Sequence, residues 1–214
     1  MINDKRVIEP SCKIDPEKDK VFLDQKRILP RKKLCILLHK PRGVTSTKKD
    51  PFAKRTVMDL LPRCYSHLNP VGRLDRDTTG LILLTNDGGL IDKLTHPRYN
   101  VEKVYLVAID KRLSIRDKAR LERGVVLNRR CTAPCRIRLK DKTELEMTLR
   151  EGRKRQIKRM FSKIGYRVVG LKRVKEGALG LGLLPEGRWR FLTEEEIAEL
   201  PVPQGYGARA VKKG

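Results

Sequence analysis

Short apolar runs recur along the chain, separated by polar and charged stretches. The runs with strand composition are residues 34–38, 81–84, 101–109, 125–140 and 142–149. The first two are almost wholly apolar, as in buried strands. The last two flank Asp141, where a turn is expected. The pattern therefore predicts strands, some of them buried, between residues 34 and 149.

Helix signals lie between and after these runs. They predict helices over residues 57–61, after the N-cap candidates Asn86 and Asp87, between Ser114 and the C-cap Gly124, and after the capping box of Thr193 and Glu196. One further helix is predicted from an apolar stripe at i, i+3, i+4 and i+7, formed by Ile157, Met160, Phe161 and Ile164.

The two ends of the chain are more polar than the middle. Val21–Leu23 followed by polar residues predicts a strand that enters a turn, and residues 30–33 predict a linker. We therefore expect an N-terminal segment (1–30), a main domain (31–200) and a disordered basic tail (201–214).

The charge balance indicates the kind of partner. The 214 residues contain 50 Lys and Arg against 26 Asp and Glu, a formal net charge of +24. This excess argues against an enzyme of neutral metabolites and favours a polyanion, which would be RNA, DNA or an anionic membrane. No run approaches the roughly 18 apolar residues of a membrane span, and no signal peptide opens the chain. We expect a cytoplasmic, monomeric protein that binds nucleic acid.

The five cysteines are odd in number and widely scattered, at positions 12, 35, 64, 131 and 135. This distribution argues against a disulfide framework. Cys131 and Cys135 suggest a metal pair, but no second pair accompanies them and the three histidines are dispersed. Reduced thiols are favoured, and we expect neither a metal nor a cofactor.

The stretch from Gly72 to Gly88 carries the clearest chemical signal. Asp75 lies between Arg73 and Arg76 in Gly-Arg-Leu-Asp-Arg-Asp, just before a predicted buried strand. Catalytic groups favour loops that a rigid core element holds in place. By spacing alone, a charged turn in which Asp75 pairs with Arg73 or Arg76 is an equal alternative.

The whole string resembles the signature of the pseudouridine synthases, in the branch that modifies ribosomal RNA. The resemblance extends from about Lys33 to about Leu200. It implies that Asp75 is catalytic and that the fold is α+β, with a large mixed, mostly antiparallel sheet flanked by helices. Residues 2–28 resemble the latter part of an S4-like RNA-binding domain without its helical first half. They are a truncated or degenerate module, or a plain extension.

Two other motifs extend the resemblance. Residues 39–44 are similar to the family's Asn/His-Lys-Pro-x-Gly motif, in which Lys40 and Arg42 would grip phosphate or form a turn that contacts nothing. Lys103 and Tyr105 form its Lys-x-Tyr motif, and on a strand they share one face. A lone tyrosine would be a core aromatic, but the resemblance implies that Tyr105 stacks on the target base. Lys103 is expected to contact RNA.

Residues 151–160 resemble the third motif of the family. In this motif a basic residue after Gln-hydrophobic pairs with the catalytic aspartate, and here it is Lys158, with Arg153 as the alternative. Arg153, Arg155 and Arg159 are also expected to bind RNA, although a solvated helix face would explain Arg155 as well.

The implied reaction breaks the C1′–N1 bond of uridine, rotates the uracil and rejoins it through C5. Asp75 would supply a carboxylate that Lys158 keeps ionised. Arg73 would fill the space left by the extruded nucleotide or hold its backbone, and Tyr105 would stack on the base. Whether Asp75 attacks the sugar or removes its 2′ proton stays open.

The end of the main domain indicates the target. Residues 187–196 resemble the large-subunit members more than the small-subunit member. We therefore expect a uridine, or a few neighbouring ones, in large-subunit ribosomal RNA or a pre-ribosomal particle. The alternatives are a small-subunit enzyme and a non-catalytic RNA-binding assembly factor. A DNA-binding regulator ranks last, because no helix-turn-helix or zinc-finger pattern is present.

Overall fold

The computed structural model describes residues 1–9, 11–15, 18–29 and 32–201. The chain divides into two compact units, residues 1–32 and a main unit that begins at Lys33. The first unit contains an antiparallel hairpin of β1 (Val21–Leu23) and β2 (Lys26–Ile28), which confirms the predicted strand and turn. Residues 30–31 of the predicted linker and residues 202–214 of the predicted tail lie outside the described residues.

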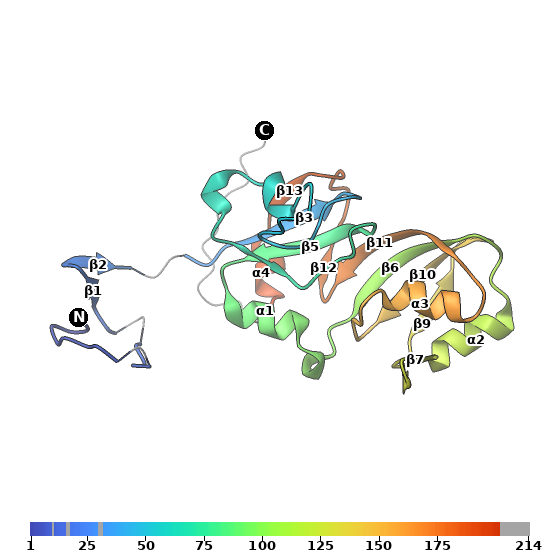
Figure 1. The fold of residues 1–214 in the computed structure, drawn as a ribbon, viewed down its shortest axis with the longest axis horizontal. Coiled ribbons are helices and arrows are strands. Elements are labelled where there is room, and N and C mark those ends of the chain that lie inside the picture. Colours follow the sequence, from blue (N-terminus) through green and yellow to red (C-terminus); the bar gives the residue numbers. More distant parts are fainter. Residues whose placement is uncertain (10, 16–17, 30–31, 202–214) are drawn as a thin grey trace. The chain divides into compact units, whose positions relative to one another are not determined.

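A nine-stranded sheet forms the main unit (Figure 1). Its strands follow the order β13 (Trp189–Phe191), β3 (Cys35–Lys40), β5 (Thr79–Thr85), β11 (Val168–Glu176), β6 (Lys103–Ile109), β10 (Glu144–Leu149) and β9 (Arg136–Leu139). In addition, β4 (Asn69–Val71) pairs with β5, and β12 (Leu179–Gly180) pairs with β11. The one parallel pair among the described strands is β5 with β11. The predicted α+β fold with a mixed, mostly antiparallel sheet is confirmed.

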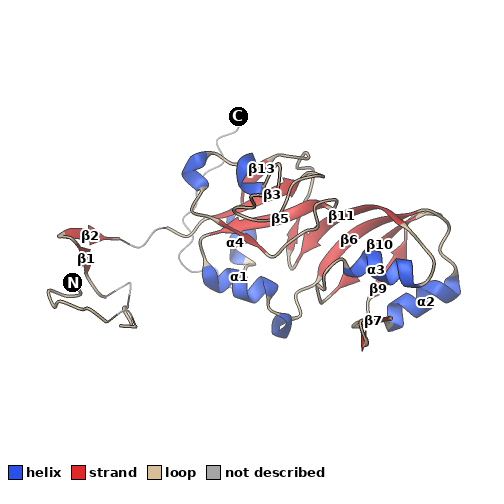
Figure 2. Ribbon diagram, in the orientation of Figure 1, coloured by secondary structure: helices blue, strands red, loops and turns tan. Residues whose placement is uncertain are grey.

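The helices are short, and three of the four α-helices begin at a side-chain cap, whereas the helix Gln156–Lys163 begins after Arg155 without one (Figure 2). They are α1 (Gly88–Thr95), α2 (Ile115–Arg123), α3 (Gln156–Lys163) and α4 (Glu194–Ala198), with 3-10 turns η1 (Val57–Leu60), η2 (Arg63–Tyr65) and η3 (Pro97–Tyr99). The side chains of Asp87, Ser114 and Thr193 accept hydrogen bonds from the first turns of α1, α2 and α4. Each such cap contributes about 1 kcal/mol. None of these helices, in the described part of the chain, is long and apolar enough to cross a membrane.

The structure differs from the predicted strands in two places. Residues 125–140 form no continuous strand, because Asn128 and Arg129 adopt left-handed backbone angles and turn the chain between β7 (Val126–Leu127) and β8 (Arg130–Cys131). The central strand β11 was not predicted, since lysines and an arginine interrupt its apolar pattern.

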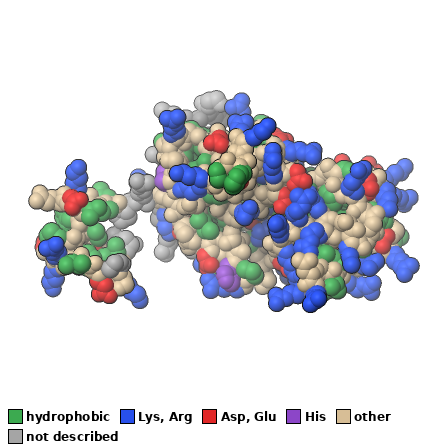
Figure 3. All heavy atoms as spheres, viewed as in Figure 1, with side chains coloured by type: hydrophobic (Ala, Val, Ile, Leu, Met, Phe, Trp, Pro, Cys, Tyr) green, Lys and Arg blue, Asp and Glu red, His purple; other side chains and the backbone are tan. Residues whose placement is uncertain are grey.

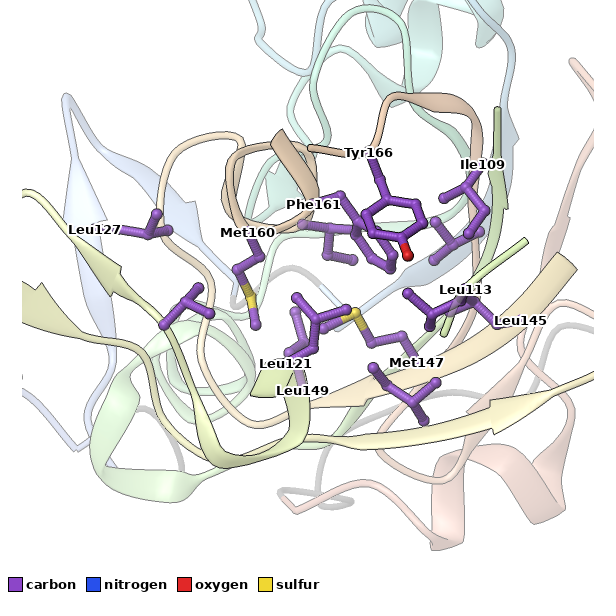
Figure 4. Packing of buried hydrophobic residues seen from close by; sticks show 14 residues of the cluster. Ile109, Leu113, Leu121, Leu127, Leu145, Met147, Leu149, Met160, Phe161 and Tyr166 are labelled. Atoms are coloured by element: carbon purple, nitrogen blue, oxygen red, sulfur yellow. The ribbon is translucent and has the colours of Figure 1, made fainter. Parts of the chain in front are cut away.

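Three hydrophobic clusters cover the sheet. In one cluster, α2 and α3 pack on β6 and β10, with Met147 and Phe161 at its centre (Figure 4). In the second cluster, η1 packs on one face of β3 and β5. In the third cluster, α1 packs on the opposite face of the same two strands, where the alternate residues of β3 and β5 point. Tyr105 packs against both the first and the second clusters. Tyr105 therefore lies where the half of the main unit built on β3 and β5 meets the half built on β6 and β10.

The two halves are joined by a very close backbone approach. Gly80 on β5 lies opposite Arg173 on β11, and a Cβ added to Gly80 would lie 2.2 Å from the Arg173 carbonyl oxygen. The φ of Gly80 is +109°, which L side chains rarely adopt. Only glycine fits this junction without displacing the backbone.

Candidate active site

An open cleft of about 660 Å³ lies beside Tyr105. Its walls come from the loop before β5, which carries Arg73 and Asp75, the segment 151–157 at the start of α3, and the loop after β3. Cavities of roughly 300–1,000 Å³ are typical of small-ligand sites. The cleft therefore has room for a nucleoside and brings Asp75 and Tyr105 together.

Hydrogen bonds to its backbone fix the loop that carries Asp75. Ser46 is buried, and its hydroxyl accepts a hydrogen bond from the Leu74 N–H (3.1 Å) and donates one to the Leu74 carbonyl (3.0 Å). The Thr78 N–H donates to the Asp75 carbonyl (3.0 Å) and closes the turn. The side chain of Asp75 remains 27% exposed. Asp75 is thus a rigidly held carboxylate that a ligand can reach.

Lys158 lies between two carboxylates. Its Nζ is 3.9 Å from Asp75 Oδ2 and 2.5 Å from Asp77 Oδ1. Sequence reasoning placed Lys158 next to Asp75 and missed Asp77, although this second acid of Arg-Leu-Asp-Arg-Asp was an available signal. Burial raises the pKa of Asp77, but Lys158, with help from Arg155, outweighs it and holds the pKa below its usual range. Asp77 is therefore ionised at neutral pH.

A buried network shapes the start of α3. Gln156 Nε2 donates to Glu151 Oε1 (2.7 Å), and Gln156 Oε1 accepts from the Arg153 N–H (2.9 Å). The Arg153 guanidinium donates to Glu151 and to the carbonyls of Arg130 and Cys131. The alternative partner proposed for Asp75 is therefore engaged elsewhere, and Arg153 braces the wall of the cleft.

A buried ion pair that the sequence did not indicate lies next to Tyr105 in the sheet. Arg173 faces Tyr105 across the β11–β6 ladder, and its Nη2 lies 3.1 Å from Glu176 Oε2. Both members of this ion pair are almost completely buried, and Arg173 Nε also donates to the Leu81 carbonyl (2.8 Å). Burial raises the pKa of Tyr105, which opposes the effect of Arg173 and keeps the phenol protonated at neutral pH.

The prediction that Lys40 grips phosphate is wrong. Lys40 is fully buried, because the strand extends through it rather than ending at residue 38. Its ammonium donates to the carbonyls of Val44 (2.8 Å), Pro41 (2.9 Å) and Arg76 (3.4 Å). Lys40 therefore supports the Asp75 loop from inside. Burial lowers its pKa to about 8 despite the opposing charges of Asp77, Glu186 and Asp75.

Lys103 is also turned inward. Its side chain is 14% exposed, and its ammonium donates to the carbonyls of Val101 (3.2 Å) and Leu94 (3.4 Å). It lies 3.9 Å from Glu176. Because these partners occupy the ammonium, the predicted contact of Lys103 with RNA is corrected to a structural role.

The remaining predicted RNA ligands lie nearer the surface. Arg73 is exposed in the cleft and Arg155 is half-exposed, 3.8 Å from Asp77. Arg42 is exposed, and the Arg159 guanidinium donates to Asn128 Oδ1 (2.6 Å). Figure 3 shows Lys and Arg side chains spread over the visible face of the main unit, with acidic side chains among them. This distribution suits a polyanionic ligand.

The cleft offers a reachable carboxylate and an aromatic ring, and the Lys158 ammonium lies 3.9 Å from that carboxylate. Such a carboxylate can act as a nucleophile or as a base. Across the described ranges, no three His, Cys, Asp or Glu side chains are grouped to hold a metal ion.

Comparison with known proteins agrees with this geometry. Residues 34–163 match the family model described as RNA pseudouridylate synthase. The large-subunit pseudouridine synthase B of Bacillus subtilis is 36% identical over 98% of this chain and 88% of its own length. The small-subunit pseudouridine synthase A of Salmonella typhimurium is 40% identical over 77% of this chain and 72% of its own length.

A solved structure supports the same assignment. A crystal structure of a pseudouridylate synthase superimposes with a TM-score of 0.76 at 33% identity, over 94% of this chain and 87% of the other. Sequence and fold therefore agree over nearly the whole chain. This chain belongs to the RNA pseudouridylate synthase family.

Proposed function

We propose that this enzyme isomerises one uridine, or a few neighbouring ones, in large-subunit ribosomal RNA, with Asp75 as the essential carboxylate. The observation that carries the proposal is the position of Asp75. It lies in a cleft that Tyr105 also lines, with the Lys158 ammonium 3.9 Å from its carboxylate.

The reaction requires that the target uridine leaves its stack, which costs a few kcal/mol. The ring of Tyr105 would receive the extruded uracil, and the exposed Arg73 would hold the backbone or fill the vacated space. Asp75 would then act at the sugar, as a nucleophile at C1′ or as the base that removes the 2′ proton. After the C1′–N1 bond breaks, the uracil rotates within the cleft and C5 bonds to C1′, while the bond to Asp75 breaks or C2′ regains its proton. The C5 proton is then lost to solvent and N1 takes up a proton.

Lys158 and Asp77 would support this step electrostatically. A cation near a partly buried carboxylate favours its ionised form. Since Asp77 lies closer to the ammonium, Asp75 retains a free face toward the cleft. The Lys158 ammonium, anchored on Asp77, would thus face Asp75 without blocking the approach of that carboxylate to the sugar.

The choice of ribosomal subunit rests on similarity. The Bacillus large-subunit enzyme matches 98% of this chain, whereas the small-subunit enzymes of Salmonella typhimurium and Yersinia pestis match 77% and 90%. Residues 187–196 also resemble the large-subunit members more. We further propose that the enzyme acts in the cytoplasm as a monomer, on ribosomal RNA or a pre-ribosomal particle, without a cofactor.

Mapping of pseudouridines in both ribosomal RNAs tests this function. Cells that lack the protein are complemented with the wild type or with Asp75→Asn. We expect a large-subunit site to disappear in the deletion and to return with the wild type alone. Loss of a small-subunit site instead would refute the target but keep the chemistry. Restoration by Asp75→Asn would refute the catalytic assignment and favour a non-catalytic assembly factor.

A further inference from the structure

The loop after β3 carries an aromatic ring that the fold leaves uncovered. Phe52 is 96% exposed, whereas Phe161 is fully buried and Phe191 packs edge-on against Tyr65 and Trp189. Phe52 also lines the cleft that contains Asp75. Its place at the cleft, rather than its exposure alone, makes the ring available to a ligand, since unpaired RNA bases commonly stack on aromatic side chains.

The loop presents this ring on an ordered turn. Its base is closed by hydrogen bonds from the Thr45 N–H to the Arg55 carbonyl and from the Val57 N–H to the Thr45 carbonyl, both 3.0 Å. At the tip of the loop, the Phe52 N–H donates to the Asp50 carboxylate (3.0 Å), and the Ala53 N–H donates to the Asp50 carbonyl (3.1 Å). Because the backbone is held at both places, little ordering is required when a ligand meets the ring.

Positive charges lie on the same loop and in the lining of the cleft. The loop carries Lys48, Lys49, Lys54 and Arg55 in the sequence, and Arg73, Lys154 and Arg155 line the cleft together with Phe52. Cations beside an exposed aromatic ring are the usual combination for single-stranded nucleic acid, since phosphates meet the charges and bases stack on the ring.

We infer that Phe52 stacks on an unpaired nucleobase beside the target uridine. This inference rests on the proposed action on RNA. The stacked base would hold the strand at the rim of the cleft while the neighbouring uridine enters toward Tyr105. Phe52 is thus a substrate-binding residue outside the reacting centre. It would favour target uridines whose neighbouring base is unpaired.

The test compares two fluorescein-labelled 12-nucleotide single-stranded RNAs by fluorescence anisotropy. One carries all its bases, and the other carries abasic residues at its central positions. The variants are Phe52→Ala, Phe52→Leu and Phe52→Trp in the full chain, with Leu183→Ala as the matched control. Leu183 is an apolar residue with 101% exposure that does not line the cleft.

Phe52→Ala should weaken binding of the complete RNA between about 5- and 150-fold, the range found for loss of one stacking platform. It should leave the abasic RNA unaffected. Phe52→Trp should restore binding, whereas Phe52→Leu should not. Leu183→Ala should match the wild type with both RNAs.

The inference would be overturned by equal binding of Phe52→Ala and the wild type to the complete RNA, by an equal loss with the abasic RNA, or by rescue with leucine. An effect seen with ribosomal particles but not with free RNA would also overturn it and would indicate a protein partner. Tritium release by the wild type from 5-tritiated uridine in ribosomal RNA reports separately on the proposed function. A failure there is therefore distinguishable from a failure of the Phe52 inference.

Discussion

Lys158 lies closer to Asp77 than to Asp75, at 2.5 Å against 3.9 Å. The ammonium is therefore anchored on a carboxylate that is not among those lining the cleft. From this position it lies near the Asp75 carboxylate while leaving the Asp75 side chain 27% exposed. The arrangement separates the task of holding the cation from the task of meeting the substrate.

Asp75→Asn should abolish isomerisation and leave RNA binding nearly intact. The change removes one ionised carboxylate and no contact with phosphate, so the loss of rate should be at least about 10²-fold, as for other essential acid–base groups. Tritium release measures the reaction and anisotropy measures binding. Release by the variant at the wild-type level would exclude Asp75 as the essential group.

Asp77→Asn should reduce activity much less than Asp75→Asn. Without its closer partner, Lys158 would shift toward Asp75 and restrict access to it, with an expected loss of about tenfold, equivalent to about 1.4 kcal/mol. Single-turnover kinetics should show this loss in the chemical step with unchanged RNA affinity. Equal losses in the two variants would contradict the distinction between the aspartates.

Gly80→Ala should destabilise the main unit by about 3 kcal/mol or more. The added Cβ would lie 2.2 Å from the Arg173 carbonyl oxygen, at a backbone angle that disfavours alanine. Urea unfolding measures the change. Gly88→Ala is the matched control, because nothing lies within 4 Å of its added Cβ, and it should have little effect.

Breaking the buried ion pair next to Tyr105 should be costly. Arg173→Met leaves the carboxylate of Glu176 buried without its main partner and should cost about 3–5 kcal/mol. The double variant Arg173→Met/Glu176→Leu should cost less than the sum of the two single changes. Additive losses in a double-mutant cycle would show that the two side chains do not act as a pair.

The dependence of stability on pH should report on Lys40. Its folded-state pKa of about 8 lies below the usual value of about 10.4 in an unfolded chain. Below pH 8 both states carry the proton, so the cost of burying the charge is constant. Between these pKa values the unfolded state binds more protons, and the free energy of unfolding should rise with pH by up to about 1.4 kcal/mol per unit.

Lys40→Met should reduce this rise to the part contributed by Lys103, whose pKa is also lowered by burial, whereas the exposed Lys49→Met should retain it in full. Urea unfolding of the three proteins from pH 7 to 10.5 measures the difference. Parallel curves for the wild type and Lys40→Met would show that Lys40 is not the group responsible.

Local sequence determined the elements whose signals lie within a few residues. The apolar stripe of α3, the caps Asp87 and Ser114, and the capping box at Thr193 all predicted helices that the structure contains. These features depend on contacts within one or two turns, so the backbone pattern alone specifies them. The motif around Asp75 likewise identified the family, because a long specific string of residues can be recognised without knowledge of the fold.

Only the tertiary structure decided which charged side chains are internal. Lys40 and Lys103 match basic motifs in the sequence, yet strand pairing and neighbouring carbonyls enclose both ammonium groups. Arg173 lies in β11, whose charged residues hid the apolar pattern of a strand. It pairs with Gly80 on β5, which is 93 residues away in the sequence. Burial of a charge depends on remote segments that pair in the sheet, and no local pattern encodes that pairing.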